Sequence, residues 1–211
     1  MILTVGNVKG GCGKTTVSTN LAILRAALRK DVLLVDGDEQ GTASLFTQLR
    51  AEQLGAVGYT AVSLHGAAVR TQVQRLRDKY DDVIIDVGGR DTGSLRAALT
   101  VAHLLLIPVQ PRSFDLWSVD QVMKLAEEAK TINPDLKVMA FLNSADSQGR
   151  DNSDALAELA GIEGLAVAKP VLVRRKAYPN AAAAGRGITE MTPKDAKALE
   201  ELTGLARVAF R

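Results

Sequence analysis

Short runs of consecutive apolar residues alternate along this chain with segments whose apolar residues recur every three or four positions. The continuous runs are rich in β-branched residues, which is typical of strands that helices cover on both faces. These runs predict strands at residues 2–7, 32–36, 82–86, 103–109 and 136–142, with shorter strands at 59–62 and 165–167.

Helical spacing fills the intervals between these strands. Residues 16–30, for example, place Val17, Leu21 and Leu24 on one face of a helix. The same spacing predicts further helices at residues 43–53, 67–80, 94–101, 115–131, 151–161 and 192–210. Because strands and helices alternate from end to end, the sequence predicts one α/β domain over residues 1–211. Its sheet is expected to be doubly wound, mainly parallel and flanked by helices.

A glycine-rich loop, VGNVKGGCGKTT at residues 5–16, joins the first predicted strand to the first helix. Three of its glycines, Gly10, Gly11 and Gly13, lie close together just before Lys14. Without Cβ atoms at these positions, main-chain N–H groups can turn onto phosphate oxygens, and the positive end of the helix dipole points to the same place. In such a loop Lys14 can reach the β- and γ-phosphates, and the Thr15 hydroxyl is placed to ligate Mg²⁺.

The loop departs from the usual P-loop pattern at its start. The pattern G-x-x-x-x-G-K-[ST] ends correctly at Gly13, Lys14 and Thr15, but its first glycine would fall at Val8. Instead, Lys9 precedes a glycine pair. This form resembles the deviant Walker A loop of the ParA/MinD family of P-loop ATPases, in which the early lysine reaches the nucleotide of the other subunit in a dimer.

The resemblance implies a P-loop NTPase fold that binds ATP with Mg²⁺. It assigns nucleotide contacts to Gly10, Gly11, Cys12, Gly13, Lys14, Thr15 and Thr16. It also assigns Lys9 and Lys14 to catalysis, where their charges offset the charge that develops on the phosphates.

Carboxylates follow two predicted strands, at the sheet edge where open α/β folds bind ligands. Residues 36–40, DGDEQ, resemble the family motif D-x-D-P-Q, with Glu39 where proline is usual. The resemblance implies that Asp36 helps to hold the water shell of the metal and that Asp38 orients the attacking water. Turn formation and capping of the next helix are the alternative roles for both residues.

Residues 82–86, DVIID, followed by Gly88 and Gly89, have the Walker B form. The resemblance implies that Asp86 holds Mg²⁺ through water, while Thr15 is a direct ligand. The glycines would let the main chain approach the γ-phosphate, and Arg90 and Asp91 would belong to a switch that senses it. A solvated ion pair is the alternative for Arg90 and Asp91.

Three further assignments also depend on the resemblance. Asn143, at the end of a predicted strand, would pair with the adenine edge, and Pro170 would pack against the base. The loop at residues 111–117 would lie at the dimer face. A simple strand-end role for Asn143 and a plain connection at 111–117 are the alternatives.

Composition narrows the class of protein. Apolar residues make up 46% and charged residues 24% of the chain, as in ordinary globular proteins. The single cysteine, Cys12, excludes an intramolecular disulfide and the cysteine sets of iron–sulfur reductases. The sequence shows neither an apolar run that could span a bilayer nor a signal segment, so we expect a cytoplasmic protein.

The net charge is only +2, but positive charge is concentrated near the C-terminus. Residues 164–189 contain five cations and no acid: Lys169, Arg174, Arg175, Lys176 and Arg186. Residues 174–190 resemble the matching stretch of small plasmid-type ParA proteins. The functional interpretation is a surface, made by Arg174, Arg175, Lys176 and Arg186, that binds the DNA backbone without reading sequence. A solvated face is the alternative.

The last predicted helix distinguishes two branches of the family. MinD-type proteins end in an amphipathic helix that binds membranes. Here the polar face mixes Glu200 and Glu201 with Lys197 and Arg207, and it is not strongly basic. We therefore expect this helix to dock on the core, and we expect no membrane partner. The first predicted strand begins at residue 2, so we expect no N-terminal helix-turn-helix region.

Taken over nearly the whole chain, the resemblance implies a ParA-type ATPase for plasmid or chromosome partition. Such a protein forms a homodimer with ATP, binds non-specific DNA so that it associates with the nucleoid, and hydrolyses ATP slowly. A centromere-binding partner protein stimulates the hydrolysis. One alternative is an ATPase that positions another cargo, as MinD does. The other is a metabolic ligase like dethiobiotin synthetase, although the sequence offers no residues for its substrate pocket.

Overall fold

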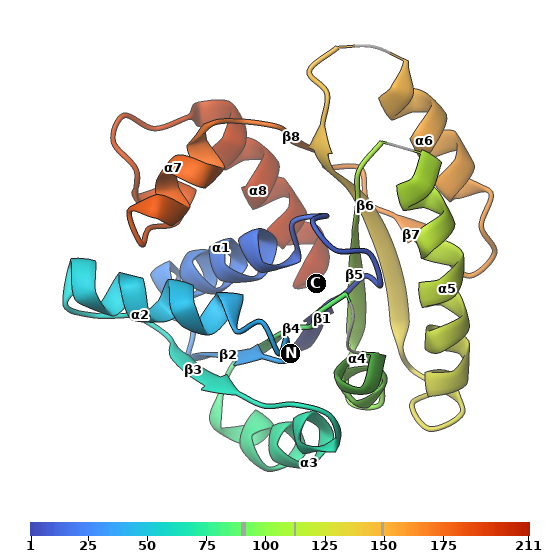
Figure 1. Cartoon of the computed structure of the whole chain (residues 1–211), viewed down its shortest axis with the longest axis horizontal. Coiled ribbons are helices and arrows are strands. Elements are labelled where there is room, and N and C mark those ends of the chain that lie inside the picture. Colours follow the sequence, from blue (N-terminus) through green and yellow to red (C-terminus); the bar gives the residue numbers. More distant parts are fainter. Residues whose placement is uncertain (90–91, 112, 149) are drawn as a thin grey trace.

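The protein is described by a computed structural model over residues 1–89, 92–111, 113–148 and 150–211. In this part of the chain eight strands form one sheet in the order β3-β2-β4-β1-β5-β6-β7, and β8 pairs with β6 (Figure 1). All pairings are parallel. The strands are β1 (Ile2–Val5), β2 (Val32–Asp36), β3 (Thr60–Ser63), β4 (Asp82–Asp86), β5 (Leu104–Val109), β6 (Lys137–Ala145), β7 (Ala166–Val167) and β8 (Leu172–Val173).

Helices cover both faces of the sheet, which confirms the predicted doubly wound fold (Figure 1). One face carries α3 (Ala67–Leu76), α4 (Thr92–Leu99), α5 (Ser113–Lys130) and α6 (Asp151–Ala160). The other carries α1 (Lys14–Ala27), α2 (Thr42–Leu54), α7 (Ala177–Ala183) and α8 (Ala196–Ala209). Two short 3₁₀ segments, η1 (Arg77–Lys79) and η2 (Ile188–Glu190), follow α3 and α7.

The strand register brings the ends of the central strands together. Strand β4 lies between β1 and β2, and Asp86 is paired in register with Val5 on one side and Asp36 on the other. These strands are buried along their whole length, as their continuous apolar runs predict. The loops that leave β1, β2 and β4 therefore meet at one edge of the sheet.

The C-terminal helix docks on the core, as expected from its mixed polar face. Leu202 and Leu205 of α8 are fully buried against the sheet. The Arg25 guanidinium lies 4.4 Å from the centre of the Phe210 ring, which fixes the end of the chain beside α1. No helix in the described ranges combines the length and the apolar character needed to cross a membrane.

The structure differs from the predicted elements mainly after residue 143. Strand β6 continues through Asn143 to Ala145, and α7 and η2 occupy a stretch for which the sequence predicted no element. Helix α8 begins later than predicted, because Asp195 caps it by accepting a hydrogen bond from the Ala198 N–H. The predicted switch residues Arg90 and Asp91 lie outside the described residues.

Candidate nucleotide-binding site

The predicted phosphate loop runs from β1 into α1. Gly13 precedes α1 with a φ of 89°, a left-handed conformation that favours glycine. A Cβ atom at this position would lie 2.3 Å from the Asn143 side-chain nitrogen. The close approach of Asn143 to the loop therefore also requires glycine here. The first N–H groups of a helix have no partner within it, and Gly13 has no side chain to cap them. This end of α1 is therefore arranged to receive an anion.

The loop opens onto a cavity of about 800 Å³. Three chain segments converge there: the loop with the start of α1, the turn after β2, and the turn after β4. The lining residues are Gly10, Gly11, Gly13, Lys14, Thr15, Thr16, Asp38, Glu39, Gln40, Thr42 and Gly89. The structure thus brings most of the predicted phosphate-contacting residues, together with Asp38, to a single site.

Lys14 is held beneath the loop. Its ammonium group donates a hydrogen bond of 2.7 Å to the Lys9 carbonyl and lies 3.8 Å from the Cys12 sulfur. The Cys12 thiol in turn donates to the Lys9 carbonyl at 3.4 Å, and burial raises the pKa of this thiol. Lys14 is only 7% exposed, so its charge acts in a largely desolvated place beside the cavity.

Asp86 is a buried carboxylate with one unsatisfied oxygen. The Ser18 hydroxyl donates to Asp86 Oδ1 at 3.0 Å, while Oδ2 has no partner among the described residues. Burial raises the pKa of Asp86 to about 7; the neighbouring Asp36 raises it further, whereas hydrogen bonds from Thr15 and Ser18 and the charge of Lys14 lower it.

This arrangement fits a hydrated magnesium ion. A buried oxygen without a partner, beside the Thr15 hydroxyl, is suited to accept a hydrogen bond from a metal-bound water. In the described part of the chain, no group of three or more histidine, cysteine or acidic side chains is arranged to hold a metal ion. Mg²⁺ needs no such group, because it keeps several waters and binds through one or two protein ligands and phosphates.

The two carboxylates after β2 have different surroundings. Asp36 is buried, and its two oxygens accept main-chain N–H bonds from Asp38 at 3.3 Å and from Ser44 at 2.7 Å. It therefore caps the start of α2, which is the alternative role that the sequence left open. Asp38 lines the cavity, and a Cβ atom at Gly88 would come within 2.6 Å of its carboxylate.

Three predicted nucleotide contacts, Cys12, Asn143 and Pro170, are not among the residues that line this cavity. The Asn143 side-chain amide donates a hydrogen bond of 2.7 Å to the Cys12 carbonyl, so it supports the phosphate loop from behind. Pro170 lies against Gly204 of α8, beside a separate hollow. Contact of Asn143 and Pro170 with a base stays a prediction.

The basic segment, which contains Arg174, Arg175, Lys176 and Arg186, is only partly a free surface. Arg174, Lys176 and Arg186 are exposed. Arg175 instead forms an ion pair with Glu201 of α8, with nitrogen–oxygen distances of 2.5 and 3.2 Å. The charge of Arg175 is therefore neutralised within the chain, and any DNA backbone contact would depend on the other three cations.

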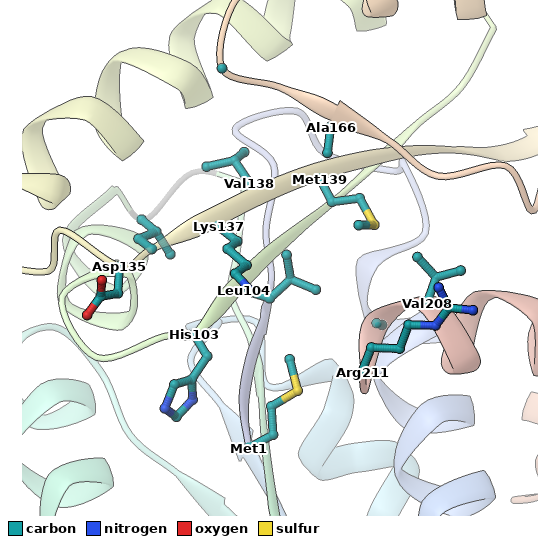
Figure 2. Close-up of a pocket in the computed structure, with 13 residues that line it drawn as sticks. Met1, His103, Leu104, Asp135, Lys137, Val138, Met139, Ala166, Val208 and Arg211 are labelled. Atoms are coloured by element: carbon teal, nitrogen blue, oxygen red, sulfur yellow. The ribbon is translucent and has the colours of Figure 1, made fainter.

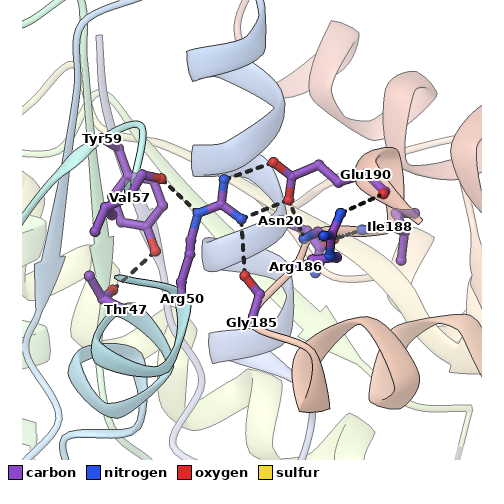
Figure 3. Close-up of polar contacts among 10 residues, drawn as sticks. Asn20, Thr47, Arg50, Val57, Tyr59, Gly185, Arg186, Ile188 and Glu190 are labelled. Atoms are coloured by element: carbon purple, nitrogen blue, oxygen red, sulfur yellow. Dashed lines mark hydrogen bonds and ion pairs between the residues drawn. The ribbon is translucent and has the colours of Figure 1, made fainter. Parts of the chain in front are cut away.

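A partly buried ion pair that the sequence did not predict holds the end of this segment (Figure 3). The Arg50 guanidinium on α2 donates two hydrogen bonds of 2.7 Å to the Glu190 carboxylate, one of 3.0 Å to the Gly185 carbonyl and one of 2.6 Å to the Val57 carbonyl. Burial alone would raise the pKa of Glu190, but the bonds from Arg50 and the Gly187 N–H lower it. The partners are more than a hundred residues apart in sequence, so no local pattern indicates them.

A second and larger hollow, of about 1100 Å³, lies at the opposite edge of the sheet (Figure 2). Its walls are mainly apolar, with Leu104, Met139 and Val208 among the lining residues, and Lys137 and Arg211 are among its charged residues. It includes neither a glycine-rich loop nor the start of a helix. The arrangement suited to phosphate is therefore at the smaller cavity.

Comparison with known proteins gives a family match over most of the chain. The CobQ/CobB/MinD/ParA nucleotide binding domain matches residues 3–188. The maintenance of carboxysome distribution protein A of Halothiobacillus neapolitanus is 32% identical over 205 residues, which cover 95% of this chain and 92% of that protein. The chromosome-partitioning ATPase Soj of Thermus thermophilus is 33% identical over 169 residues, 66% of this chain and 67% of that protein.

A solved structure with the same fold carries a bound nucleotide and magnesium. Cobyrinic acid a,c-diamide synthase from Mycobacterium smegmatis, with bound ADP and magnesium, superposes with a TM-score of 0.72 and is 26% identical. The match covers 86% of this chain and 92% of that chain.

Proposed function

The chain belongs to the CobQ/CobB/MinD/ParA family of nucleotide-binding domains, and from this premise we propose that it is a ParA-type ATPase that moves a cargo along DNA. Relatives named for chromosome partitioning and for carboxysome distribution support this proposal. The observation that carries it is the convergence of the Lys9–Lys14 loop, Asp38 and Gly89 on one cavity.

The residues of the cavity divide the work of ATP hydrolysis. Main-chain N–H groups of the loop bind the phosphates, and Lys14 lies where it can contact their oxygens. Thr15 and Asp86 would hold Mg²⁺, the latter through water. When bound, this ion neutralises charge that develops on the phosphates. Asp38, beside Gly88, orients the attacking water. With no strong general base among the assigned residues, turnover is expected to be slow.

Dimerisation links this cavity to the proposed DNA surface. Two copies would bind ATP between them, each with Lys9 directed to the nucleotide of its neighbour. A dimer doubles the exposed cations Arg174, Lys176 and Arg186, so ATP binding would strengthen non-specific DNA binding. A partner protein on the cargo would then stimulate hydrolysis and release the complex from DNA.

Two cargoes are compatible with this mechanism. A plasmid or chromosome is the cargo that the basic segment suggests, since it resembles the small plasmid-type ParA proteins. A protein compartment is the second candidate, because the carboxysome distribution protein aligns over 92% of its own length. Membrane positioning of the MinD kind is less well supported, because the apolar face of α8 is buried in the core.

Sedimentation velocity with ATP, with ADP and without nucleotide tests the proposal. We expect the unaltered protein to associate into dimers only with ATP, and Lys9→Ala to remain monomeric while it still binds ADP. ATP hydrolysis should be slow in both proteins, and a partner protein should stimulate it only in the unaltered protein. A Lys9→Ala variant that associates and hydrolyses ATP like the unaltered chain would overturn the assignment. A metabolic ligase would instead show turnover that depends on a small-molecule substrate.

A further inference from the structure

Asn7 is a fully buried polar residue at the point where β1 passes into the phosphate loop. Its side chain makes three hydrogen bonds to three different parts of the chain. The Lys9 N–H donates to Asn7 Oδ1 at 3.1 Å, and the Ser118 hydroxyl of α5 donates to the same oxygen at 2.9 Å. The Asn7 Nδ2 group donates to the Pro108 carbonyl of β5 at 3.0 Å.

The chemistry of these partners fixes the orientation of the amide. A main-chain N–H can only donate, so the atom facing Lys9 must be the oxygen. A carbonyl can only accept, so the atom facing Pro108 must be the nitrogen. In a flipped amide the nitrogen would face the Lys9 N–H, and the oxygen would face the Pro108 carbonyl. Both groups would then be buried without a hydrogen bond, which costs free energy. The side chain of Asn7 is therefore locked in one position.

The peptide units that flank Lys9 are held from several sides. The Lys9 carbonyl accepts from Lys14 at 2.7 Å, while its N–H is held by Asn7. On the side of the Walker B turn, a Cβ atom at Gly89 would come within 2.9 Å of the Lys9 carbonyl carbon. Of these contacts, the bond to Asn7 is the one that connects Lys9 to elements outside the nucleotide cavity.

We propose that Asn7 is a positioning residue for Lys9, and that Ser118 ties it to α5. The bond from Ser118 holds Asn7 Oδ1 in place, and that oxygen fixes the direction in which the main chain presents Lys9. Because the proposed role of Lys9 is to reach a second subunit, its direction matters for dimer formation more than for nucleotide binding by one copy. The inference therefore rests on the proposed function and adds two residues to it.

Three variants test this inference: Ser118→Ala, Ser118→Thr and Asn7→Ala. Each is examined for ADP affinity, for ATP-dependent association and for kcat and KM. We expect Ser118→Ala to keep the ADP affinity within about twofold, because Gly13, Lys14 and Thr15 are untouched. Its association constant and kcat should fall by about fivefold, the effect of one net hydrogen bond. In Asn7→Ala the association constant and kcat should fall further. In Ser118→Thr, which keeps the hydroxyl, both should stay close to the values of the unaltered protein.

A buried serine elsewhere serves as the matched control. Ser94 of α4 is also fully buried, and its hydroxyl accepts a hydrogen bond from the Gly66 N–H at 2.9 Å. Ser94→Ala should lower the melting temperature without changing association. If Asn7→Ala does not fold, the two Ser118 variants still decide the matter.

The outcomes separate this inference from the proposed function. If the Ser118 and Asn7 variants lose thermal stability but associate and turn over like the unaltered protein, Asn7 only completes the end of the strand and the inference is wrong. If the unaltered protein shows no ATP-dependent association, or Lys9→Ala associates normally, the proposed function itself is wrong. If the Ser118→Ala and Asn7→Ala variants lose ATP-dependent association but still bind ADP, the result supports both the inference and the proposed function.

Discussion

Asp86 is the residue whose surroundings lead to the clearest prediction about pH. Its pKa is raised from the ordinary value of 3.8 to about 7 in the folded chain. Between these two values the folded state binds a proton that the unfolded state releases, so the free energy of unfolding falls as pH rises through this window. Without metal, the protein is therefore expected to lose stability from about pH 4 to about pH 7.

Comparison with Asp86→Asn isolates this effect. The asparagine keeps an acceptor for the Ser18 hydroxyl but does not titrate. Above about pH 7, in the presence of a chelator, we expect Asp86→Asn to melt at a higher temperature than the unaltered protein. Below about pH 4 the difference should vanish. If the melting temperatures of the two proteins change in parallel across the whole pH range, Asp86 is not the group responsible for the pH dependence.

Gly88 gives a second prediction at the scale of one residue. A Cβ atom there would lie 2.6 Å from the Asp38 carboxylate, which must then move away. In Gly88→Ala we expect ATP binding to persist but kcat to fall at least about tenfold, since small displacements of a positioning group are costly. Gly161→Ala, at the end of α6 with its nearest contact at 3.4 Å, is the control. Equal kcat values for the two variants would contradict the role of Asp38.

Sequence alone was sufficient to bring together the residues that belong to local motifs. The loop around Lys14, the carboxylates at 36, 38 and 86, and the glycines after Asp86 all meet as predicted. Ser18 had a local signal, because it lies one helical turn after Lys14 and bonds its carbonyl, but it was not recognised. Asn7 and Ser118 could not be paired, because 111 residues separate them and no periodic pattern links them.

At the scale of elements, the ion pair between Arg50 and Glu190 joins α2 to η2. Arg50 is 7% exposed and Glu190 30%, so removal of the guanidinium would leave a half-buried carboxylate and two carbonyls without their donors. We expect Arg50→Ala to lower the free energy of unfolding by about 3 kcal/mol, the low end for a buried pair, because Glu190 keeps some contact with water. Urea denaturation measures this change.

A more exposed pair provides the contrast for this measurement. Lys130 and Glu127 lie 2.7 Å apart on α5 with exposed fractions of 28% and 60%. Lys130→Ala should change stability by no more than about 0.5 kcal/mol. The double variant Arg50→Ala with Glu190→Ala should recover part of the loss, since it removes the uncompensated charge. A cost for Arg50→Ala as small as that for Lys130→Ala would show that the pair is not important for stability.

Elements could be predicted where apolar periodicity was strong. The strands at 32–36 and 82–86 have the predicted bounds, and the helix predicted at 151–161 differs from α6 by one residue. The segment with α7 was missed because AYPNAAA has almost no periodic pattern and packs through few side chains, among them Ala181. Its place is set by main-chain contacts: Gly185 against α2, and the Ile188 N–H bonded to Asn20 of α1. Such contacts involve main-chain atoms, so they produce no side-chain pattern that a sequence analysis could recognise.

At the scale of the whole molecule, the basic segment and the nucleotide cavity are connected through two helices. Helix α1 begins at the phosphate loop, and α2 begins just after Asp38. The stretch that follows α7 lies against both, through Asn20 and Arg50 (Figures 1 and 3). The proposed DNA surface is thus attached to the two helices that start at the cavity, whereas α3 lies on the opposite face of the sheet.

This layout leads to a prediction about DNA binding and salt. If Arg174, Lys176 and Arg186 neutralise phosphates, the logarithm of DNA affinity in the presence of ATP falls with the logarithm of salt concentration, by roughly 0.9 for each contact. Replacing all three by alanine should weaken binding and make that dependence shallower by nearly one unit per lost contact. Three exposed cations on the opposite face, Arg75, Lys79 and Lys124, form the matched control because their removal changes the net charge equally. If DNA binding followed net charge alone, both triple variants would lose the same affinity, and a specific surface on the α7 side would be ruled out.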